Sequence, residues 1–215
     1  MNKATDLVTM PPGRPPRAMV GFFHGGGFVG GDPKQFEAPA DVLAEHGIGS
    51  ASFAYRTHAH DGAMVRDAID DARNSAVRFK TANADTPIFF SGASAGGVLA
   101  VHAALRVPTA GVVLFNPVLD LSESGFRKKK VMVGDELAVS PLHISLDTFP
   151  PALIFHGSAD TATPIGHSVL FVQRLHELGI SAELVRYEGV GHRLLKLVPF
   201  DALMTRMIAF IGNAC

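Results

Sequence analysis

The chain has 215 residues, a length that favours a single domain, residues 1–215, with several layers around one core. Its 19 Lys and Arg residues nearly balance 20 Asp and Glu residues, which argues against nucleic acid or an anionic membrane as a partner. The only cysteine is the last residue, Cys215, and no run approaches the roughly 18 apolar residues of a membrane span, so we expect a cytoplasmic protein without an internal disulfide.

Six short apolar runs are typical of β-strands. They cover residues 18–23, 49–55, 87–91, 110–116, 151–156 and 182–188. Most of them are apolar at consecutive positions, which is typical of strands that are covered on both faces. Because these runs alternate with longer helical patterns, the sequence predicts an α/β fold: a mostly parallel six-stranded sheet with helices on both faces.

Five helical patterns accompany these strands. They cover residues 32–47, 63–80, 93–107, 164–179 and 197–212. The first begins with Asp32 as a helix cap and Pro33 in the first turn. Glycines are expected to end three of the helices, at Gly47, Gly179 and Gly212.

A serine lies between the third strand and the third helix, in the segment GASAGG at residues 92–97. A nucleophilic hydroxyl must protrude from the backbone, and a sharp turn from strand to helix makes it do so. Such a turn leaves room only for small neighbours, and Gly92 and Gly96 flank Ser94 at the spacing G-x-S-x-G. The pattern predicts that Ser94 is a nucleophile. The alternative is a glycine-rich turn whose serine only caps the helix.

A second glycine-rich segment, FFHGGGFVGG, follows the first strand. In it, His24 precedes Gly25, Gly26 and Gly27, and three consecutive glycines allow backbone N–H groups to point into a cavity. Such groups can bind an oxygen atom that develops negative charge. A phosphate-binding loop is an alternative, but neither common phosphate-loop spacing is present. A glycine turn with a purely structural role is the other alternative.

Serine is a weak nucleophile unless a histidine accepts its proton and a carboxylate orients that histidine. Both are expected after later strands, because the carboxyl ends of parallel strands meet at one rim of a sheet. Asp160 follows the fifth strand and His192 follows the sixth, and the order serine, acid, histidine is typical of one such fold. Asp120 and Asp135 follow the fourth strand and are alternative acids.

Other histidines give weaker signals. His58, His60 and Asp61 are close together, but no further ligand follows at a recognised metal-binding spacing, so a polar loop with a helix cap is the favoured interpretation. Three more histidines lie in predicted helices, where surface or packing roles are expected: His102, His167 and His176. The sequence predicts neither a metal nor a cofactor.

Four motifs, HGGGF, GASAGG, HGSAD and GVGH, occur in this order from Ala18 onward. Together they resemble the α/β-hydrolase family, and within it the HGGG esterases related to hormone-sensitive lipase and the small bacterial carbohydrate esterases. The resemblance implies Ser94 as nucleophile, His192 as general base and then acid, and Asp160 as the orienting carboxylate. It also implies an oxyanion hole formed by three backbone N–H groups: those of Gly25, Gly26 and Ala95.

The resemblance further implies the strand order 4-3-5-6-7-8 in the family's naming, with the two usual leading strands missing. We expect no cap helices before the first strand, and residues 117–151, which we interpret as an insertion, are too few for a large cap domain. An uncovered site favours short acyl groups, with acetyl esters of sugars as one candidate. A free sheet edge would favour a homo-oligomer.

The function that the resemblance implies is a serine esterase that hydrolyses short-chain carboxylic esters through an acyl-enzyme intermediate, without a cofactor. Its partner would be a small-molecule ester. Two alternatives share the scaffold: an amidase or peptidase, and a catalytically silent homologue that only binds a ligand.

Overall fold

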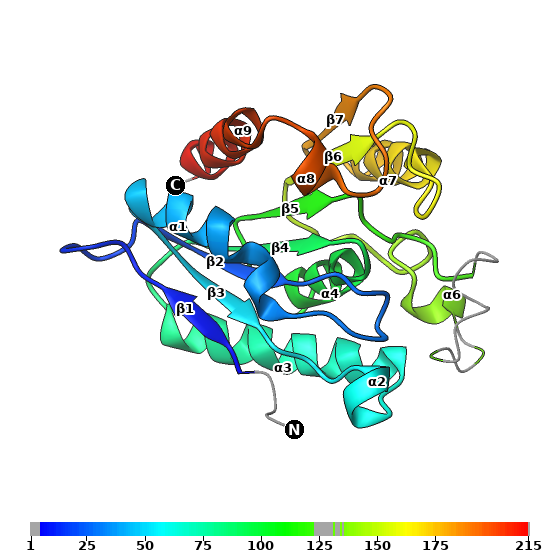
Figure 1. Cartoon of the computed structure of the whole chain (residues 1–215), viewed down its shortest axis with the longest axis horizontal. Coiled ribbons are helices and arrows are strands. Elements are labelled where there is room, and N and C mark those ends of the chain that lie inside the picture. The colour runs from blue at the N-terminus through cyan, green and yellow to red at the C-terminus, as the bar shows by residue number, and fades with distance from the viewer. Residues whose placement is uncertain (1–4, 123–130, 132–133, 135, 215) are drawn as a thin grey trace.

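The computed structural model describes residues 5–122, 131, 134 and 136–214, and a seven-stranded sheet forms its centre (Figure 1). The strands are β1 Leu7–Thr9, β2 Ala18–Phe23, β3 Ile48–Phe53, β4 Ile88–Ala93, β5 Gly111–Phe115, β6 Ala152–Gly157 and β7 Ala182–Tyr187. Their order in the sheet is β1-β3-β2-β4-β5-β6-β7. All neighbouring strands pair in parallel except β1, which is antiparallel to β3. The predicted α/β class is confirmed.

Strand β1 is the difference from the predicted sheet, for which six strands and no leading strand were expected. It covers the outer edge of β3, where Val8 pairs with Ala51, and the side chain of Asp6 accepts a hydrogen bond from the Ala54 N–H at 2.9 Å. The sequence shows no strand signal here, because three residues are too few to establish an alternating or apolar pattern. The expectation that both leading strands are missing was therefore wrong.

Helices lie on both faces of the sheet. They are η1 Pro33–Phe36, α1 Glu37–Glu45, α2 His58–Asp61, α3 Val65–Ala82, α4 Ala95–Ala104, α6 Glu136–Val139, α7 Ile165–Glu177, α8 Leu194–Leu197 and α9 Phe200–Asn213. Residues of α3, α4 and α7 share one hydrophobic cluster, and residues of α8, α9 and the η1–α1 segment share the other. Figure 1 shows α1 and α9 on the opposite side of the sheet from α3 and α4.

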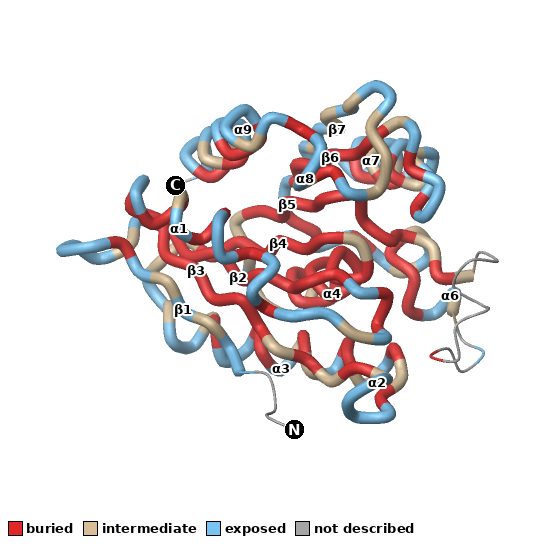
Figure 2. Tube along the Cα trace, in the orientation of Figure 1, coloured by how far each residue is buried: buried red, intermediate tan, exposed pale blue. Residues whose placement is uncertain are grey.

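The strands divide their side chains between these two clusters. Met19 and Phe23 of β2 belong to the cluster with α3 and α4, whereas Val20 and Phe22 belong to the cluster with α1 and α9. This alternation follows from the two-residue period of a strand. Every residue of β2, β3, β4, β5 and β6 is buried, whereas β7 at the edge is only partly covered (Figure 2). The central strands therefore give their carboxyl-terminal loops a rigid base.

The predicted helix ends are confirmed at two glycines and wrong at a third. Asp32 accepts a hydrogen bond from the Lys34 N–H at 2.9 Å and so caps η1. Gly47 and Gly179 follow helices and each have a φ of 74°, the left-handed conformation that ends a helix. Gly212 has no positive φ and lies inside α9, which continues to Asn213, because a glycine ends a helix only where the chain adopts that conformation.

The segment 117–151 packs against the core in the part that the structure describes. Leu119, Leu121 and Leu146 are fully buried in the cluster that contains α4. Neither this segment nor any other described part of the chain forms a large cap over the sheet. Two residues considered from the sequence, Asp135 and Cys215, lie outside the described residues.

None of the helices in the described ranges combines the length and the apolar character needed to cross a membrane.

Candidate active site

Ser94 occupies the sharp turn between β4 and α4. Its φ of 52° and ψ of −119° are unusual for a residue with a side chain, and such backbone strain persists only where the surroundings enforce it. The Ser94 N–H donates to the Phe115 carbonyl at 3.0 Å, and the Ser94 carbonyl accepts from the N–H groups of Gly97 and Val118 at 2.9 Å each. These bonds hold the turn against both α4 and the end of β5.

Steric crowding explains the small residues around Ser94. A Cβ atom on Gly92 would lie 2.0 Å from the carbonyl oxygen of Gly96, and a Cβ atom on Gly96 would lie 2.0 Å from that of Phe23. Both distances are far inside van der Waals contact and involve backbone atoms that cannot move aside. The spacing G-x-S-x-G is therefore required by the close approach of β4, α4 and β2.

Three predicted residues from distant parts of the chain meet at this turn. His192 Nε2 lies 3.0 Å from Ser94 Oγ, and His192 Nδ1 lies 2.7 Å from Asp160 Oδ2. Asp160 follows β6 and His192 follows β7, so the parallel strands bring the three loops to one rim. Because the carboxylate can only accept, Nδ1 carries the proton and Nε2 is free to accept the serine proton.

The Asp160 carboxylate is held by backbone and side-chain donors. Oδ1 accepts from the N–H groups of Ala162 and Thr163 at 2.8 and 2.9 Å. Oδ2 accepts from the Thr163 hydroxyl at 2.7 Å and from Asn116 Nδ2 at 2.5 Å, in addition to His192. The carboxylate can therefore rotate only by breaking several hydrogen bonds at once.

The same donors keep Asp160 ionised. Burial raises the pKa of this carboxyl, but the His156 N–H group 3.5 Å away and the hydrogen bonds from His192 and Thr163 together outweigh burial and hold the pKa well below its ordinary value. His156 is itself fully buried; its Nε2–H donates to the Thr163 carbonyl at 2.8 Å, and its Nδ1 accepts from the Ser168 hydroxyl at 2.8 Å. Asp160 thus presents a negative charge to His192 at neutral pH.

The glycine loop packs against the nucleophile turn. A Cβ atom on Gly25 would lie 3.4 Å from the Cβ of Ser94, and Gly26 has a φ of 120° with no room for a side chain, because a Cβ there would lie 2.0 Å from the Gly30 carbonyl oxygen. The Gly25 N–H donates to Gln35 Oε1 at 2.7 Å. The expectation that this N–H is available to an oxyanion was therefore wrong for this conformation.

His24 supports the loop rather than joining the reactive groups. Its Nδ1–H donates to the Gly25 carbonyl at 2.7 Å, its ring stacks on Tyr55 with centroids 4.2 Å apart, and the Tyr55 hydroxyl donates to the His24 carbonyl at 2.8 Å. Burial lowers the pKa of His24, although its hydrogen bond to Gly25 acts in the opposite direction. A neutral His24 therefore fixes the start of the glycine loop.

Ala95 is placed at the first turn of α4, directly after Ser94. The first four N–H groups of an α-helix have no intrahelical partner. The Ala95 N–H is one of them, and the helix end carries partial positive charge. It is thus suited to contact an oxygen atom bound beside Ser94.

The alternative acid and the alternative metal site considered from the sequence are not formed by the described residues. Asp120 accepts hydrogen bonds from His143 Nε2 at 3.1 Å and from the Ser122 N–H at 2.7 Å, and no hydrogen bond joins it to His192. His58, His60 and Asp61 form α2. Over the ranges that the structure covers, no group of three or more His, Cys, Asp or Glu residues could hold a metal ion.

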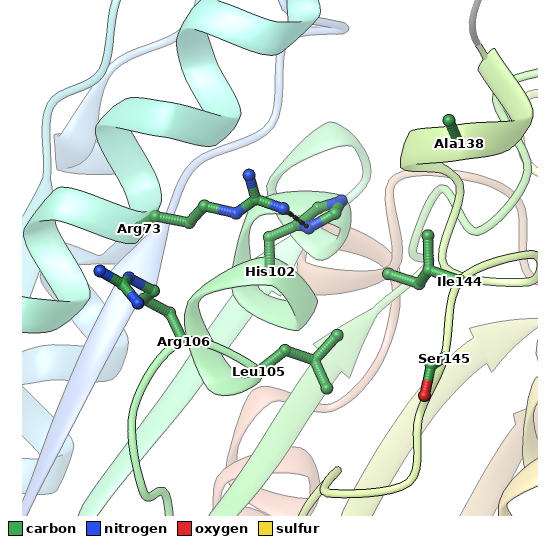
Figure 3. A pocket seen from close by; sticks show the side chains of 7 residues that line it. All are labelled: Arg73, His102, Leu105, Arg106, Ala138, Ile144 and Ser145. Carbon is green, nitrogen blue, oxygen red and sulfur yellow. Dashed lines mark hydrogen bonds between the residues drawn. The ribbon is translucent and has the colours of Figure 1, made fainter.

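A cavity of about 390 Å³ is lined by a different set of residues, whose side chains are drawn in Figure 3. Its lining consists of Arg73, His102, Leu105, Arg106, Ala138, Ile144 and Ser145. His102 is buried here, where its Nε2–H donates to the Val139 carbonyl at 2.9 Å and its Nδ1 accepts from Arg73 at 3.2 Å. A larger groove of about 1200 Å³ runs beside His24 and Tyr55. Ser94, Asp160 and His192 line neither of these spaces.

Sequence reasoning did not find Asn116, Thr163, His156 or Gln35. Asn116, Thr163 and Gln35 are single polar residues that belong to no motif, and His156 is the first residue of HGSAD, a motif in which only Asp160 was assigned a role. Their positions beside Asp160 and Gly25 appear only once the loops are folded.

Comparisons with known proteins identify a family and similar structures. A sequence model of the family described as alpha/beta hydrolase fold matches residues 20–138. The structure of esterase 2 from Thermogutta terrifontis with bound propionate is 29% identical, with a TM-score of 0.80, over 97% of this chain and 86% of that one. The same esterase phosphonylated by sarin gives 28% identity and a TM-score of 0.82 over 96% and 87%.

A curated relative matches a shorter stretch. It is an isoprenylcysteine alpha-carbonyl methylesterase of Arabidopsis thaliana, 44% identical over 43 residues, which are 20% of this chain. The match spans only a tenth of the length of that protein.

Proposed function

The chain belongs to the α/β-hydrolase fold family, and from this membership we propose that it is a serine esterase that cleaves short-chain carboxylic esters through an acyl-enzyme intermediate. The chain is an esterase-like hydrolase, because the family model matches more than half of it and the similar solved structures are esterases. The observation that carries the proposal is the continuous set of hydrogen bonds from Ser94 through His192 to Asp160.

In the proposed mechanism, Ser94 Oγ attacks the carbonyl carbon of the ester while its proton moves to His192 Nε2. Asp160 stabilises the resulting imidazolium. The negative oxygen of the tetrahedral intermediate accepts hydrogen bonds from the N–H groups of Gly26 and Ala95. When the intermediate collapses, the bond to the alcohol oxygen breaks, and that oxygen takes the proton from His192 Nε2.

The second half of the reaction repeats these steps with water. His192 accepts a proton from the water molecule as its oxygen attacks the acyl carbon on Ser94. The second tetrahedral intermediate then releases the carboxylic acid, and the proton on His192 returns to Ser94 Oγ. The overall reaction converts an ester and water into a carboxylic acid and an alcohol and restores Ser94 and His192. The proposed steps use no cofactor.

The preference for short acyl groups is supported by two observations. No large cap covers the sheet in the described ranges, so the site lacks the enclosed surface that a long acyl chain would need. The similar esterase of Thermogutta terrifontis has been solved with propionate and with butyrate bound, which are short carboxylates. Acetyl esters of sugars are one candidate class of substrate within this range.

The test is the rate of hydrolysis of p-nitrophenyl esters from two to twelve acyl carbons, beside an acetylated sugar. The ratio kcat/KM should be highest for the shortest acyl groups, and Ser94→Ala should lower kcat about 10⁴-fold or more. Ser145→Ala serves as the matched control, since this exposed serine is hydrogen-bonded to Asp147 and its replacement should leave kcat unchanged. Full activity of Ser94→Ala would refute the nucleophile, and a preference for twelve carbons would refute the short-chain class.

A further inference from the structure

Asn116 takes no part in the proton transfers of the mechanism, yet it is buried beside Asp160. It follows β5 directly, its exposed fraction is 2%, and its φ of 42° lies in the left-handed region. Its N–H donates to the Phe155 carbonyl at 2.8 Å, which anchors its backbone to β6. A buried, strained polar residue at the carboxyl end of a central strand needs an explanation beyond packing.

The side-chain amide of Asn116 joins three loops. Its Nδ2 donates to Asp160 Oδ2 at 2.5 Å and to the Gly191 carbonyl at 3.3 Å, and its Oδ1 accepts from the Gly157 N–H at 3.2 Å. Gly157 ends β6, Asp160 lies in the loop after β6, and Gly191 directly precedes His192. One amide therefore connects the end of β5 to both loops that carry the acid and the base.

The orientation of this amide is fixed by its backbone partners. The Gly157 N–H can only donate and therefore faces the amide oxygen, whereas the Gly191 carbonyl can only accept and therefore faces the amide nitrogen. Rotating the amide by 180° would lose both bonds. The NH₂ group is thus held toward Asp160 whether or not His192 carries a second proton.

We propose that Asn116 is a positioning residue that aims Asp160 Oδ2 at His192 Nδ1 and withdraws part of the carboxylate charge. The inference rests on the proposed function, since it assigns Asn116 a role in the same reaction. Three donors, from Asn116, Thr163 and His192, converge on Oδ2. Asn116 therefore limits how strongly Asp160 holds a proton on His192, and it touches no reacting atom itself.

The first test is Asn116→Gly, which removes the amide but tolerates the left-handed backbone. It should lower kcat roughly 10- to 100-fold, because the acid–histidine pair loses its alignment. KM should stay unchanged, because the hydrogen bonds of Asn116 go to Phe155, Gly157, Asp160, Thr163 and Gly191 and not to Ser94 Oγ or the glycine loop. The acid limb of the kcat/KM profile should move to higher pH, since a carboxylate with one donor fewer holds the proton on His192 more tightly.

Two further variants separate this role from a structural one. Asn116→Asp keeps the shape but replaces the donor with an acceptor, and should lower kcat at neutral pH at least as much as Asn116→Gly. His156 is a second titratable group beside this carboxylate, because its Nε2 lies 3.5 Å from Asp160 Oδ2. The pH profile of each variant is therefore compared with that of the wild type, which contains the same histidine. Asn83→Gly is the matched control: Asn83 donates to the Phe79 carbonyl at the end of α3, before the start of β4, whereas Ser94 follows the end of that strand. This variant should leave kcat unchanged.

These experiments distinguish failure of the proposed function from failure of this inference alone. If wild-type hydrolysis does not depend on Ser94, as measured with Ser94→Ala and a fluorophosphonate label, both the function and this inference fail. If hydrolysis depends on Ser94 but Asn116→Gly keeps the wild-type kcat and pH profile, only the inference fails, and Asn116 merely forms a turn. If Asn116→Gly does not fold, the inference is tested with Asn116→Asp, by its pH profile and by the low-field NMR signal of the His192 Nδ1 proton. A wild-type pH profile and an unshifted NMR signal would overturn the inference.

Discussion

Gln35 belongs to none of the sequence motifs, but its side chain contacts the glycine loop at Gly25. It accepts the hydrogen bond of the Gly25 N–H although it is itself exposed, and Gly25 packs directly against Ser94. Gln35→Ala should loosen the loop and lower kcat on p-nitrophenyl acetate by less than the roughly 100-fold that follows loss of an oxyanion donor itself. Gln35→Glu keeps an acceptor oxygen and should retain more activity than Gln35→Ala. A rise in kcat for Gln35→Ala would instead identify Gly25 as a donor that Gln35 blocks.

Individual residues could be predicted from the sequence where a motif surrounds them. Ser94 stands within a glycine pattern, and Asp160 and His192 follow apolar strands, so their types and positions point to one chemistry. Asn116 follows a strand in the same way, but a lone asparagine there is equally typical of an ordinary turn. Its role depends on contacts with two other loops, and no local pattern encodes those contacts.

The close approach of α4 to β2 leaves no room for a side chain at Gly96. Gly96→Ala would place a Cβ 2.0 Å from the Phe23 carbonyl oxygen and push α4 away from β2. We expect a loss of several kcal/mol in the free energy of unfolding, about 3 kcal/mol or more, as for other overpacked or strained sites. The measurement is urea-induced unfolding followed by circular dichroism.

The matched control is Gly166→Ala in the first turn of α7. A Cβ on Gly166 meets no atom within 4 Å, and alanine favours a helix over glycine by about 0.5–1 kcal/mol. This variant should be as stable as the wild type or more so. Equal stability of Gly96→Ala and Gly166→Ala would contradict the steric account of the turn.

Elements were predictable where their residues repeat a clear pattern. Most central strands are largely apolar, because helices cover both faces of the sheet, and all six predicted strands are present within a few residues. Strand β1 has three residues at the sheet edge, which is too short for a periodic signal. The end of α9 was misjudged because Gly212 signals termination only through a backbone conformation that the sequence does not reveal.

The stability of the whole molecule should depend on pH through His102. Burial lowers its pKa from 6.5 to about 4, with Arg73 lowering it further and Asp70 and the bond to Val139 acting in the opposite direction. Between these values the unfolded chain binds a proton that the folded chain does not. The free energy of unfolding should therefore fall as the pH drops from 6.5 towards 4, by about 3 kcal/mol at most for this group.

The check is urea unfolding of the wild type and of His102→Gln at pH 7, 5.5 and 4.5. Glutamine does not titrate, so the variant should be less stable at pH 7 but show a shallower decline. His24, whose pKa burial also lowers, contributes equally to both proteins. Parallel declines in the two proteins would exclude His102 as a source of the pH dependence.

The expectation of a homo-oligomer stays a prediction. It was based on a free sheet edge beside β3, and β1 covers that edge. At the opposite edge, β7 carries the charged residues Glu183 and Arg186, and charges on an edge strand disfavour pairing with another copy.

Ser94 and His192 are separated by 98 positions along the chain but share a hydrogen bond. The hydroxyl can become reactive only after β4, β6 and β7 have taken their final places beside one another. A growing or partly denatured chain therefore holds an inert serine. The rate at which a fluorophosphonate modifies this residue is consequently a direct reporter of complete assembly of the sheet.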